Sequence, residues 1–200
     1  MRVEDHSTLH QLIEGYTRHS EDLQKDKEQQ IWQAFGTTGA VLITDMSGFS
    51  AITKQHGIVY YLSLIMHMQQ IVEDCIRHYD GLLIKYVADD AFFLFPDTAS
   101  ALLAVRDIFT RLQALNDELT DCHDIKLAIG IAYGELLNFN NQEIFGDPVN
   151  EASKLGEDTA SAWEILLTEK AYQNLPAELQ QAKDQQDITI GKVTYPTYFL

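Results

Sequence analysis

Two aspartates stand where the sequence predicts that a strand ends or that a hairpin turns. Asp45 follows the apolar run 40–44, which is typical of a strand buried on both faces. Asp89 lies between the apolar runs 82–87 and 91–95, which predict a hairpin because Asp tolerates turn conformations. Hard divalent cations prefer carboxylate oxygens, so aspartates at adjacent strand ends could hold two ions about 3.5–4 Å apart. The simpler alternative is that Asp45 caps the next helix and Asp89 only turns the chain.

Further polar positions could contact a ligand. Lys85 lies in an otherwise apolar strand, where an unpaired ammonium group is costly, so it either reaches solvent or meets a ligand. Asn150 and Lys154 are four residues apart and therefore share one face of a predicted helix. The segment 46–50 leads from a strand into a helix, and backbone amides at a helix N-terminus are a natural seat for phosphate groups.

The elements that would position these residues alternate along the chain. Amphipathic helices are predicted over 58–79 and 97–115, where apolar residues recur every three to four positions. The predicted core stripe of the first helix is Ile58, Leu62, Ile65, Met68, Val72, Cys75 and Tyr79. With a strand over 125–132, the order becomes strand, helix, strand, strand, helix, strand. This ferredoxin-like βαββαβ arrangement predicts an α+β fold with helices on one face of a mainly antiparallel sheet.

The composition changes abruptly near residue 38. Residues 4–35 are polar with sparse apolar positions, which favours a weakly amphipathic helix, and 36–39 (GTTG) is typical of a turn. We therefore predict an N-terminal helical extension over residues 1–38 and one folded domain over 39–200. Within that domain, a second turn is predicted at Tyr133 and Gly134.

Charge and composition narrow the possible partners. The formal net charge is −16, from 30 acidic against 14 basic residues, which disfavours binding to a nucleic-acid backbone. No stretch approaches the roughly 18 consecutive apolar residues of a membrane span, and the first residues lack the apolar core of a signal peptide. Cys75 and Cys122 show no ligand spacing and are expected to be free thiols. We expect a soluble, cytoplasmic protein that binds neither membrane nor nucleic acid.

Four segments resemble the signature blocks of the class III adenylate and guanylate cyclase family, in the order and at the spacing of that family. They are 40–50 (AVLITDMSGFS), 81–96 (GLLIKYVADDAFFLFP), 125–136 (IKLAIGIAYGEL) and 143–155 (EIFGDPVNEASKL). The resemblance extends over roughly residues 39–200. It implies a stand-alone bacterial catalytic domain that converts ATP to 3′,5′-cyclic AMP and pyrophosphate, as a homodimer with two shared sites.

The resemblance also assigns roles to the aspartates. Asp45 and Asp89 match the two metal-binding aspartates of the family, with the backbone carbonyl of Met46 as a third contributor. The implied cofactors are two Mg²⁺ or Mn²⁺ ions in each active site. Asp90 is a neighbouring competitor, but Ala88 and Asp89 align with the glycine–aspartate step of the family.

Base recognition is implied for a lysine and an acid. Lys85 matches the adenine-contacting lysine of the family, and Glu143 matches the acidic partner of the exocyclic amine. Adenine offers an acceptor at N1 and a donor at N6, which suit a lysine and a carboxylate, whereas guanine reverses both. Cytosine offers the same pattern as adenine, so CTP stays open. The alternative is that Lys85 and Glu143 form a cross-strand ion pair.

The remaining assignments include two departures from the family. Asn150 matches the asparagine that orients the ribose, but Lys154 replaces the arginine that stabilises the transition state. Ala88 replaces the usual glycine and would be strained if the turn needs a positive φ. Lys192 roughly matches a basic residue that contacts the terminal phosphates. The departures keep open a second hypothesis, a catalytically weak nucleotide-binding signalling module.

Overall fold

The computed structural model describes residues 13–14, 16–18, 20–119, 124–190 and 193–200. Its helices are α2 (Glu21–Phe35), α3 (Phe49–His56), α4 (Ile58–His78), α5 (Thr98–Glu118), α6 (Asp147–Asp158), α7 (Glu169–Asn174) and the short 3-10 helices η1 (Tyr16–Arg18) and η2 (Ala177–Leu179). Its strands are β1 (Gly36–Met46), β2 (Leu82–Val87), β3 (Asp90–Phe95), β4 (Leu127–Phe139), β5 (Glu143–Phe145), β6 (Ile165–Thr168), β7 (Asp184–Ile190) and β8 (Val193–Phe199).

The strands form one mixed sheet. Their order is β2-β3-β1-β4-β6-β8-β7, and β5 pairs with β4. The pairing of β4 with β6 is parallel and the other pairings are antiparallel. The expected α+β class and the βαββαβ order of β1, α4, β2, β3, α5 and β4 are confirmed. Because β3 pairs with β1, the turn between β2 and β3 lies beside the end of β1, where the candidate site is expected.

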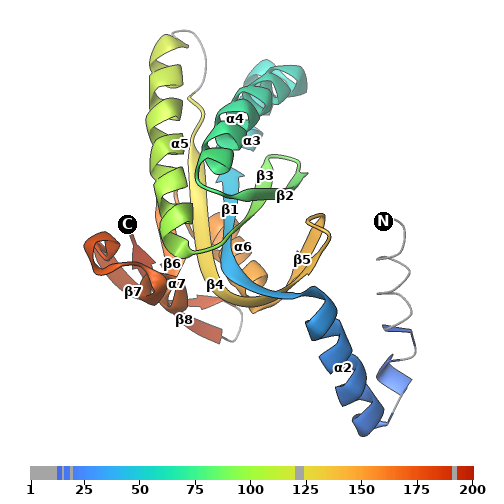
Figure 1. Cartoon of the computed structure of the whole chain (residues 1–200). Coiled ribbons are helices and arrows are strands. Elements are labelled where there is room, and N and C mark those ends of the chain that lie inside the picture. The colour runs from blue at the N-terminus through green and yellow to red at the C-terminus, as the bar shows by residue number, and fades with distance from the viewer. Residues whose placement is uncertain (1–12, 15, 19, 120–123, 191–192) are drawn as a thin grey trace.

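Helices cover both faces of this sheet. In β1, Ala40 and Leu42 pack in the cluster that contains α4 and α5, whereas Val41 and Ile43 pack with Ala152 of α6. Figure 1 shows α4 and α5 in front of the sheet and α6 behind it. The expectation of helices on one face therefore holds for α4 and α5 but not for α6. The apolar run of β1 follows from this, because both of its faces are covered.

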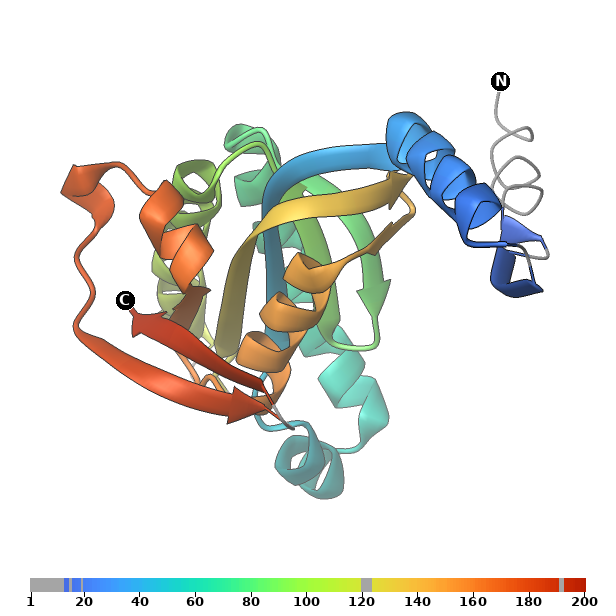
Figure 2. The same cartoon turned by 90° about the horizontal axis from the view of Figure 1, so that it is seen from below.

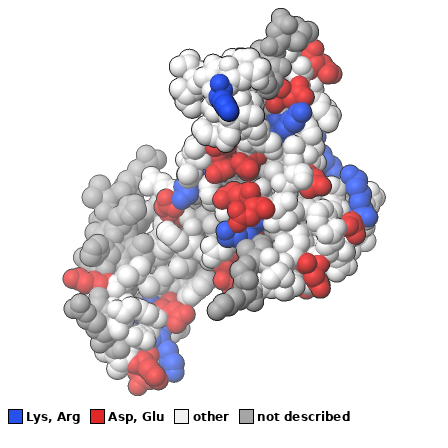
Figure 3. Space-filling view, turned by 180° about the vertical axis from the view of Figure 1, so that it is seen from behind, with Lys and Arg blue, Asp and Glu red and all other residues white. Residues whose placement is uncertain are grey.

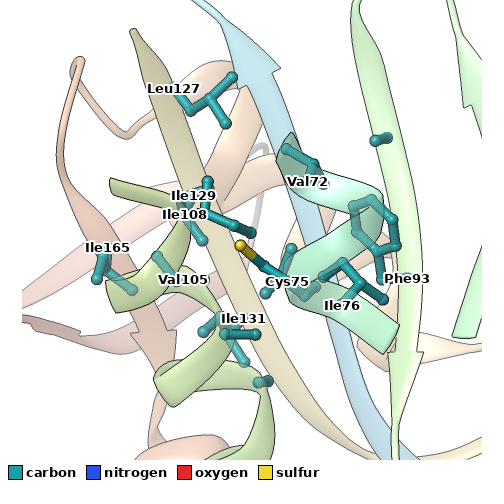
Figure 4. Close-up of a cluster of buried hydrophobic side chains, with 14 of the residues drawn as sticks. Val72, Cys75, Ile76, Phe93, Val105, Ile108, Leu127, Ile129, Ile131 and Ile165 are labelled. Atoms are coloured by element: carbon teal, nitrogen blue, oxygen red, sulfur yellow. The ribbon is translucent and has the colours of Figure 1, made fainter. Parts of the chain in front are cut away.

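The larger core lies between the sheet and helices α4 and α5. Figure 4 shows part of it, in which Cys75 and Ile76 of α4 meet Ile108 of α5 and Ile129 of β4. The free thiol of Cys75 is fully buried, and burial raises its pKa to about 12, so it behaves as an apolar side chain. Cys122 lies outside the described residues.

Two expected turns are extended strand. Residues 36–39 are the first part of β1, and Tyr133 and Gly134 lie within the continuous strand β4. Gly39 stands opposite Gly134 in the pairing of these strands, and a Cβ on Gly39 would lie 2.6 Å from the carbonyl oxygen of Phe95. Gly39 therefore allows close approach of backbone, and Gly134 leaves room for the side chain of Pro148, rather than either glycine changing the direction of the chain.

The first residues of α4 bury a different face of the helix from the one that the sequence predicts. Ile65, Met68, Val72 and Cys75 are buried as expected, but Ile58 and Leu62 are exposed and Tyr61 is buried instead. The chain reaches α4 through Gly57, whose φ of 85° few other residues adopt. The first turns of α4 extend past the end of β1, so they have no sheet to cover (Figure 1).

Helix α2 projects from the body of the molecule (Figure 2). Within it only Ile31 is buried, as expected for a weakly amphipathic helix. The boundary predicted after residue 38 stays a prediction. No helix in the described ranges is both long and apolar enough to span a membrane.

Candidate functional site

Three carboxylates meet where β1 ends beside the β2–β3 turn. Asp45 is the second-last residue of β1, Asp89 lies in the turn, and Asp90 begins β3. The side chains of Asp45 and Asp90 share a hydrogen bond. Burial raises the pKa of Asp45, and the nearby charge of Asp89 adds to this rise. Burial also raises the pKa of Asp90 to about 7, with further contributions from Glu157 and Asp45.

These groups fit a divalent cation. Burial is the larger cause of the raised pKa values of Asp45 and Asp90, and the neighbouring carboxylates add to it, so a cation bound here would offset both effects. One carboxylate oxygen of Asp90, Oδ1, is buried without a hydrogen-bond partner in the described part of the chain. Within that part, no three His, Cys, Asp or Glu side chains are grouped so as to hold an ion by themselves. Backbone oxygens, water molecules or ligand phosphates would therefore have to complete the coordination.

A tyrosine that the sequence analysis did not single out reaches this cluster. Tyr61 of α4 is fully buried, and its hydroxyl donates a hydrogen bond to Oδ2 of Asp89 at 2.7 Å. The carbonyl oxygen of Met46 is a second acceptor, 3.3 Å from the same hydroxyl. The ring of Phe49 packs edge-on against Tyr61, with ring centroids 4.9 Å apart. A buried tyrosine needs a polar partner, which is the one signal that could have drawn attention to this residue.

The turn that carries Asp89 has an unusual backbone. Ala88 has φ of 55°, the left-handed region in which a Cβ is disfavoured. The sequence-based concern about a missing glycine therefore applies to this turn. On the other side of the cluster, Gly48 has φ of 100° and α3 begins at Phe49, so the chain turns sharply after β1.

Lys85 and Glu143 lie together although 58 residues separate them along the chain. The ammonium of Lys85 is 2.7 Å from Oε2 of Glu143, with 32% and 40% of the two side chains exposed. The same ammonium lies 5.2 Å from the ring centroid of Phe92. The alternative of an ion pair is thus what a single chain forms. Partial exposure keeps the net contribution of such a pair near 0–1 kcal/mol, about the scale of surface pairs, so a ligand could displace it.

Asn150 and Lys154 lie on the exposed face of α6, opposite the buried Ala152 and Leu155. The ammonium of Lys154 is 2.6 Å from Oδ2 of Asp158, one turn further along the helix. Within the described chain, no hydrogen bond or ion pair joins Asn150 or Lys154 to the aspartate cluster. Lys192 lies outside the described residues.

Of the predicted site residues that the structure describes, only Met46 is buried, and the others are partly or fully exposed. A cavity of about 710 Å³ lies elsewhere, lined by Trp32, Gly134, Asp147 and Lys170 among others, and it contains none of the predicted site residues. Acidic side chains gather near the middle of the face opposite α4 and α5, with a few basic ones beside them (Figure 3). A nucleotide bound to one chain alone would leave much of its surface in water, whereas small-molecule sites usually bury most of their ligand.

Comparison with known proteins relates most of this chain to one family. The family described as "Adenylate and Guanylate cyclase catalytic domain" matches residues 36–200. The uncharacterized protein Rv2212 of Mycobacterium tuberculosis is 26% identical over 139 residues, which are 70% of this chain and 35% of that protein. The chain therefore spans about a third of the length of the curated relatives that it matches.

Solved structures share the fold at low identity. The adenylyl cyclase CyaB of P. aeruginosa has a TM-score of 0.68 and 19% identity, and the match covers 82% of this chain and 93% of that one. The guanylate cyclase domain of RhGC from Catenaria anguillulae, solved with GTP, also has a TM-score of 0.68 and 19% identity, covering 81% and 94%. Domains that are named for adenine and for guanine nucleotides therefore have the same fold, and fold similarity does not indicate the base.

Proposed function

The chain belongs to the adenylate and guanylate cyclase catalytic domain family, and we propose that it converts ATP into 3′,5′-cyclic AMP and pyrophosphate. The observation that carries the proposal is the meeting of Asp45 and Asp89 at adjacent strand ends. The base preference rests on a second observation, the close pairing of Lys85 with Glu143.

Asp45, Asp89 and the carbonyl of Met46 would hold two Mg²⁺ or Mn²⁺ ions. When bound, such ions lower the pKa of the ribose 3′-hydroxyl and neutralise charge on the phosphates. The contribution of the chain is to fix two carboxylates at the end of a rigid sheet, so that the ions and the α-phosphate occupy defined positions. The amides after β1, in the segment that leads into α3, would face the phosphates.

Lys85 and Glu143 would read the adenine edge. One group donates and the other accepts, and they lie next to each other as N1 and N6 do on the base. In the nucleotide complex, the lysine would donate to N1 and the carboxylate would accept from the N6 amine. This arrangement disfavours GTP. CTP remains an alternative substrate, because cytosine presents the same acceptor and amine.

A homodimer would bring the two groups of residues together. In one chain Asn150 and Lys154 are exposed, and in its described part no hydrogen bond or ion pair joins them to the aspartate cluster. A second chain could place its Lys85, Glu143, Asn150 and Lys154 over the aspartates of the first, with Asn150 orienting the ribose and Lys154 facing the α-phosphate. Lys192 would contribute to binding of the terminal phosphates. A cytoplasmic location, where ATP and divalent cations are at hand, stays part of the proposal.

A second candidate function is a nucleotide-binding signalling module with little turnover. Two observations favour it: Lys154 is engaged by Asp158, and Ala88 holds a strained backbone at the metal-binding turn. The exposed ion pair is a weak obstacle, because water screens the attraction between such groups. We therefore favour the active enzyme.

The test is to measure cyclic nucleotide formation from ATP, GTP, CTP and UTP with Mg²⁺ or Mn²⁺. We expect cyclic AMP as the main product, and expect Asp45→Ala and Asp89→Ala to abolish it without unfolding the protein. Asp187→Ala, an exposed aspartate on β7, is the matched control and should retain activity. Tight binding of ATP without any cyclic product would favour the signalling module, and turnover that survives Asp89→Ala would refute the metal assignment.

A further inference from the structure

Tyr61 is the one described side chain that links the helical core to the aspartate cluster through a short hydrogen bond to a predicted metal-binding residue. We propose that Tyr61 is a positioning residue that orients the Asp89 carboxylate and the Met46 carbonyl for a divalent cation. The inference rests on the proposed function, because it assigns a role to a residue beside the same site.

The ring of Tyr61 is held rigidly. It is fully buried in the first turn of α4 and packs against Phe49, and its surroundings are the core beneath the sheet. A side chain fixed in this way has few rotamers available, so its hydroxyl marks a defined point at the edge of the core.

The carboxylate it contacts lacks such support of its own. Asp89 lies in a two-residue turn after Ala88, whose left-handed backbone is strained. A short exposed turn would leave an aspartate free to rotate. The 2.7 Å bond from Tyr61 fixes Oδ2 and leaves Oδ1 and the remaining lone pairs for an ion.

The same hydroxyl lies 3.3 Å from the carbonyl oxygen of Met46, at the other side of the expected ion position. Tyr61 thus touches two of the three groups that the proposed function assigns to the metal. Hydrogen bonds to ligating carboxylates orient them, and their removal typically costs about 10–100-fold in metal affinity.

The chain offers a matched control. Tyr86 of β2 is partly buried, and its hydroxyl, like that of Tyr61, donates to a carboxylate, Oε1 of Glu73, at 3.1 Å. That bond lies between β2 and α4 and involves none of the proposed site residues. Tyr86→Phe and Tyr61→Phe therefore remove the same chemical group, once away from the site and once beside it.

The experiment measures Mn²⁺ binding to the full chain by electron paramagnetic resonance, with Mn²⁺ alone as the probe. We expect Tyr61→Phe to raise the Kd for Mn²⁺ by about 10–100-fold, while Tyr86→Phe leaves it unchanged. Thermal unfolding of each variant establishes that the fold persists, since both keep the ring. In the cyclase assay, Tyr61→Phe should raise the Mn²⁺ concentration needed for half-maximal rate more than it lowers kcat at saturating Mn²⁺.

Two results would overturn the inference. Mn²⁺ binding by Tyr61→Phe as tight as that of the wild type would make Tyr61 a purely structural residue, and tighter binding would mean that its hydroxyl competes with the ion. The proposed function fails separately: if Asp89→Ala bound Mn²⁺ as the wild type does, the metal assignment itself would be wrong and Tyr61 would have nothing to position.

Discussion

At the scale of single residues, Lys154 is unusual because it stands where the cyclase family has an arginine. A lysine carries one compact charge on a flexible stem, whereas an arginine presents a planar fork that can contact two phosphate oxygens at once. In a single chain the ammonium of Lys154 rests on Asp158, 2.6 Å away, and about half of the lysine side chain is exposed. Because exposed ion pairs are weak, the contact with Asp158 would not prevent the ammonium of Lys154 from binding a phosphate of the substrate instead.

Replacing this lysine separates the active enzyme from the weak module. Lys154→Arg should raise kcat with little change in KM, because the interaction is felt mainly in the transition state. Lys154→Ala should lower kcat by roughly 10–10³-fold, the scale for losing one electrostatic contact to developing charge. Steady-state kinetics with ATP measure both. Arg111→Ala, which breaks a similar ion pair with Asp107 on α5, is the control and should leave the rate unchanged.

The two substitutions at Lys154 must move kcat in opposite directions. If neither changes the rate of an enzyme that turns over, Lys154 is only a solvated helix residue and another cation, such as Lys192, does its work. If the wild type is inert and Lys154→Arg is active, the weak module is the better description.

The pair formed by Lys85 and Glu143 makes a second prediction at this scale. Lys85→Glu combined with Glu143→Cys exchanges donor and acceptor, so ATP use should fall and GTP use should rise. Each mismatched hydrogen bond costs about 1–3 kcal/mol, so we expect roughly a tenfold or larger loss of kcat/KM for ATP. Lys85→Glu alone places two acids together and should impair ATP use without a comparable gain for GTP. An unchanged ATP preference in the double variant would show that the pair does not read the base.

At the scale of elements, the β2–β3 turn combines function with backbone strain. Ala88 adopts φ of 55°, which costs about 1–2 kcal/mol for a residue with a Cβ. A glycine at this position would remove that cost. It would also increase the conformational entropy of the unfolded chain, which lowers the free energy of unfolding by roughly 0.5–1 kcal/mol. The turn therefore keeps Asp89 in place at the expense of stability, a balance that is common at functional sites.

Ala88→Gly should accordingly stabilise the protein by up to about 1 kcal/mol. The same substitution at Ala114, an exposed position within α5, should destabilise it by about 1 kcal/mol because glycine is unfavourable inside a helix. Urea unfolding of the two variants and the wild type measures both effects. Destabilisation of equal size at the two positions would mean that the turn is not strained.

The elements also show what sequence patterns can and cannot predict. Apolar periodicity predicted α4 and α5, because burial of one face imposes that period, and two apolar runs around a turn residue predicted the β2–β3 hairpin. The prediction of a turn failed at Gly134, where the glycine lies within a strand and leaves room for the side chain of Pro148. Apolar periodicity failed at Ile58 and Leu62, since a helical stripe cannot show where the sheet beneath it ends.

The residues of the candidate site also differ in how far the sequence could predict them. Asp45 and Asp89 were accessible to sequence reasoning because polar residues at strand ends stand out against apolar runs. The contact between Lys85 and Glu143 was available only through family resemblance, or as one alternative, because nothing local relates residues so far apart. Tyr61 gave only a weak signal, the need of a buried tyrosine for a polar partner, and the sequence does not show that this partner is Asp89.

At the scale of the whole molecule, the residues of the proposed site lie in two separate groups within one chain. The aspartate cluster lies at the end of β1, while Asn150 and Lys154 face outward from α6. Ile58, Leu62 and Met66 of α4 add exposed apolar surface. Exposed apolar side chains that lie close together are a feature of a surface that another chain covers. Twofold symmetry would then create two equivalent sites from the same two groups.

Mixing inactive variants tests this arrangement. Asp89→Ala impairs the aspartate half of each site and Asn150→Ala impairs the other half, so each variant alone should be nearly inactive. After equal amounts are mixed and exchange subunits, half of the dimers are mixed, and each mixed dimer has one site in which both halves are intact. Recovered activity should therefore approach about a quarter of the wild-type value, because half of the dimers are mixed and each of these has one intact site out of two.

Mixing Asp89→Ala with Asp45→Ala is the control and should recover no activity, because both changes impair the same half of the site. If the first mixture also stayed inactive although subunit exchange was complete, each active site would have to be built within one chain. Asn150 would then have to reach the aspartate cluster of its own chain by a movement of α6.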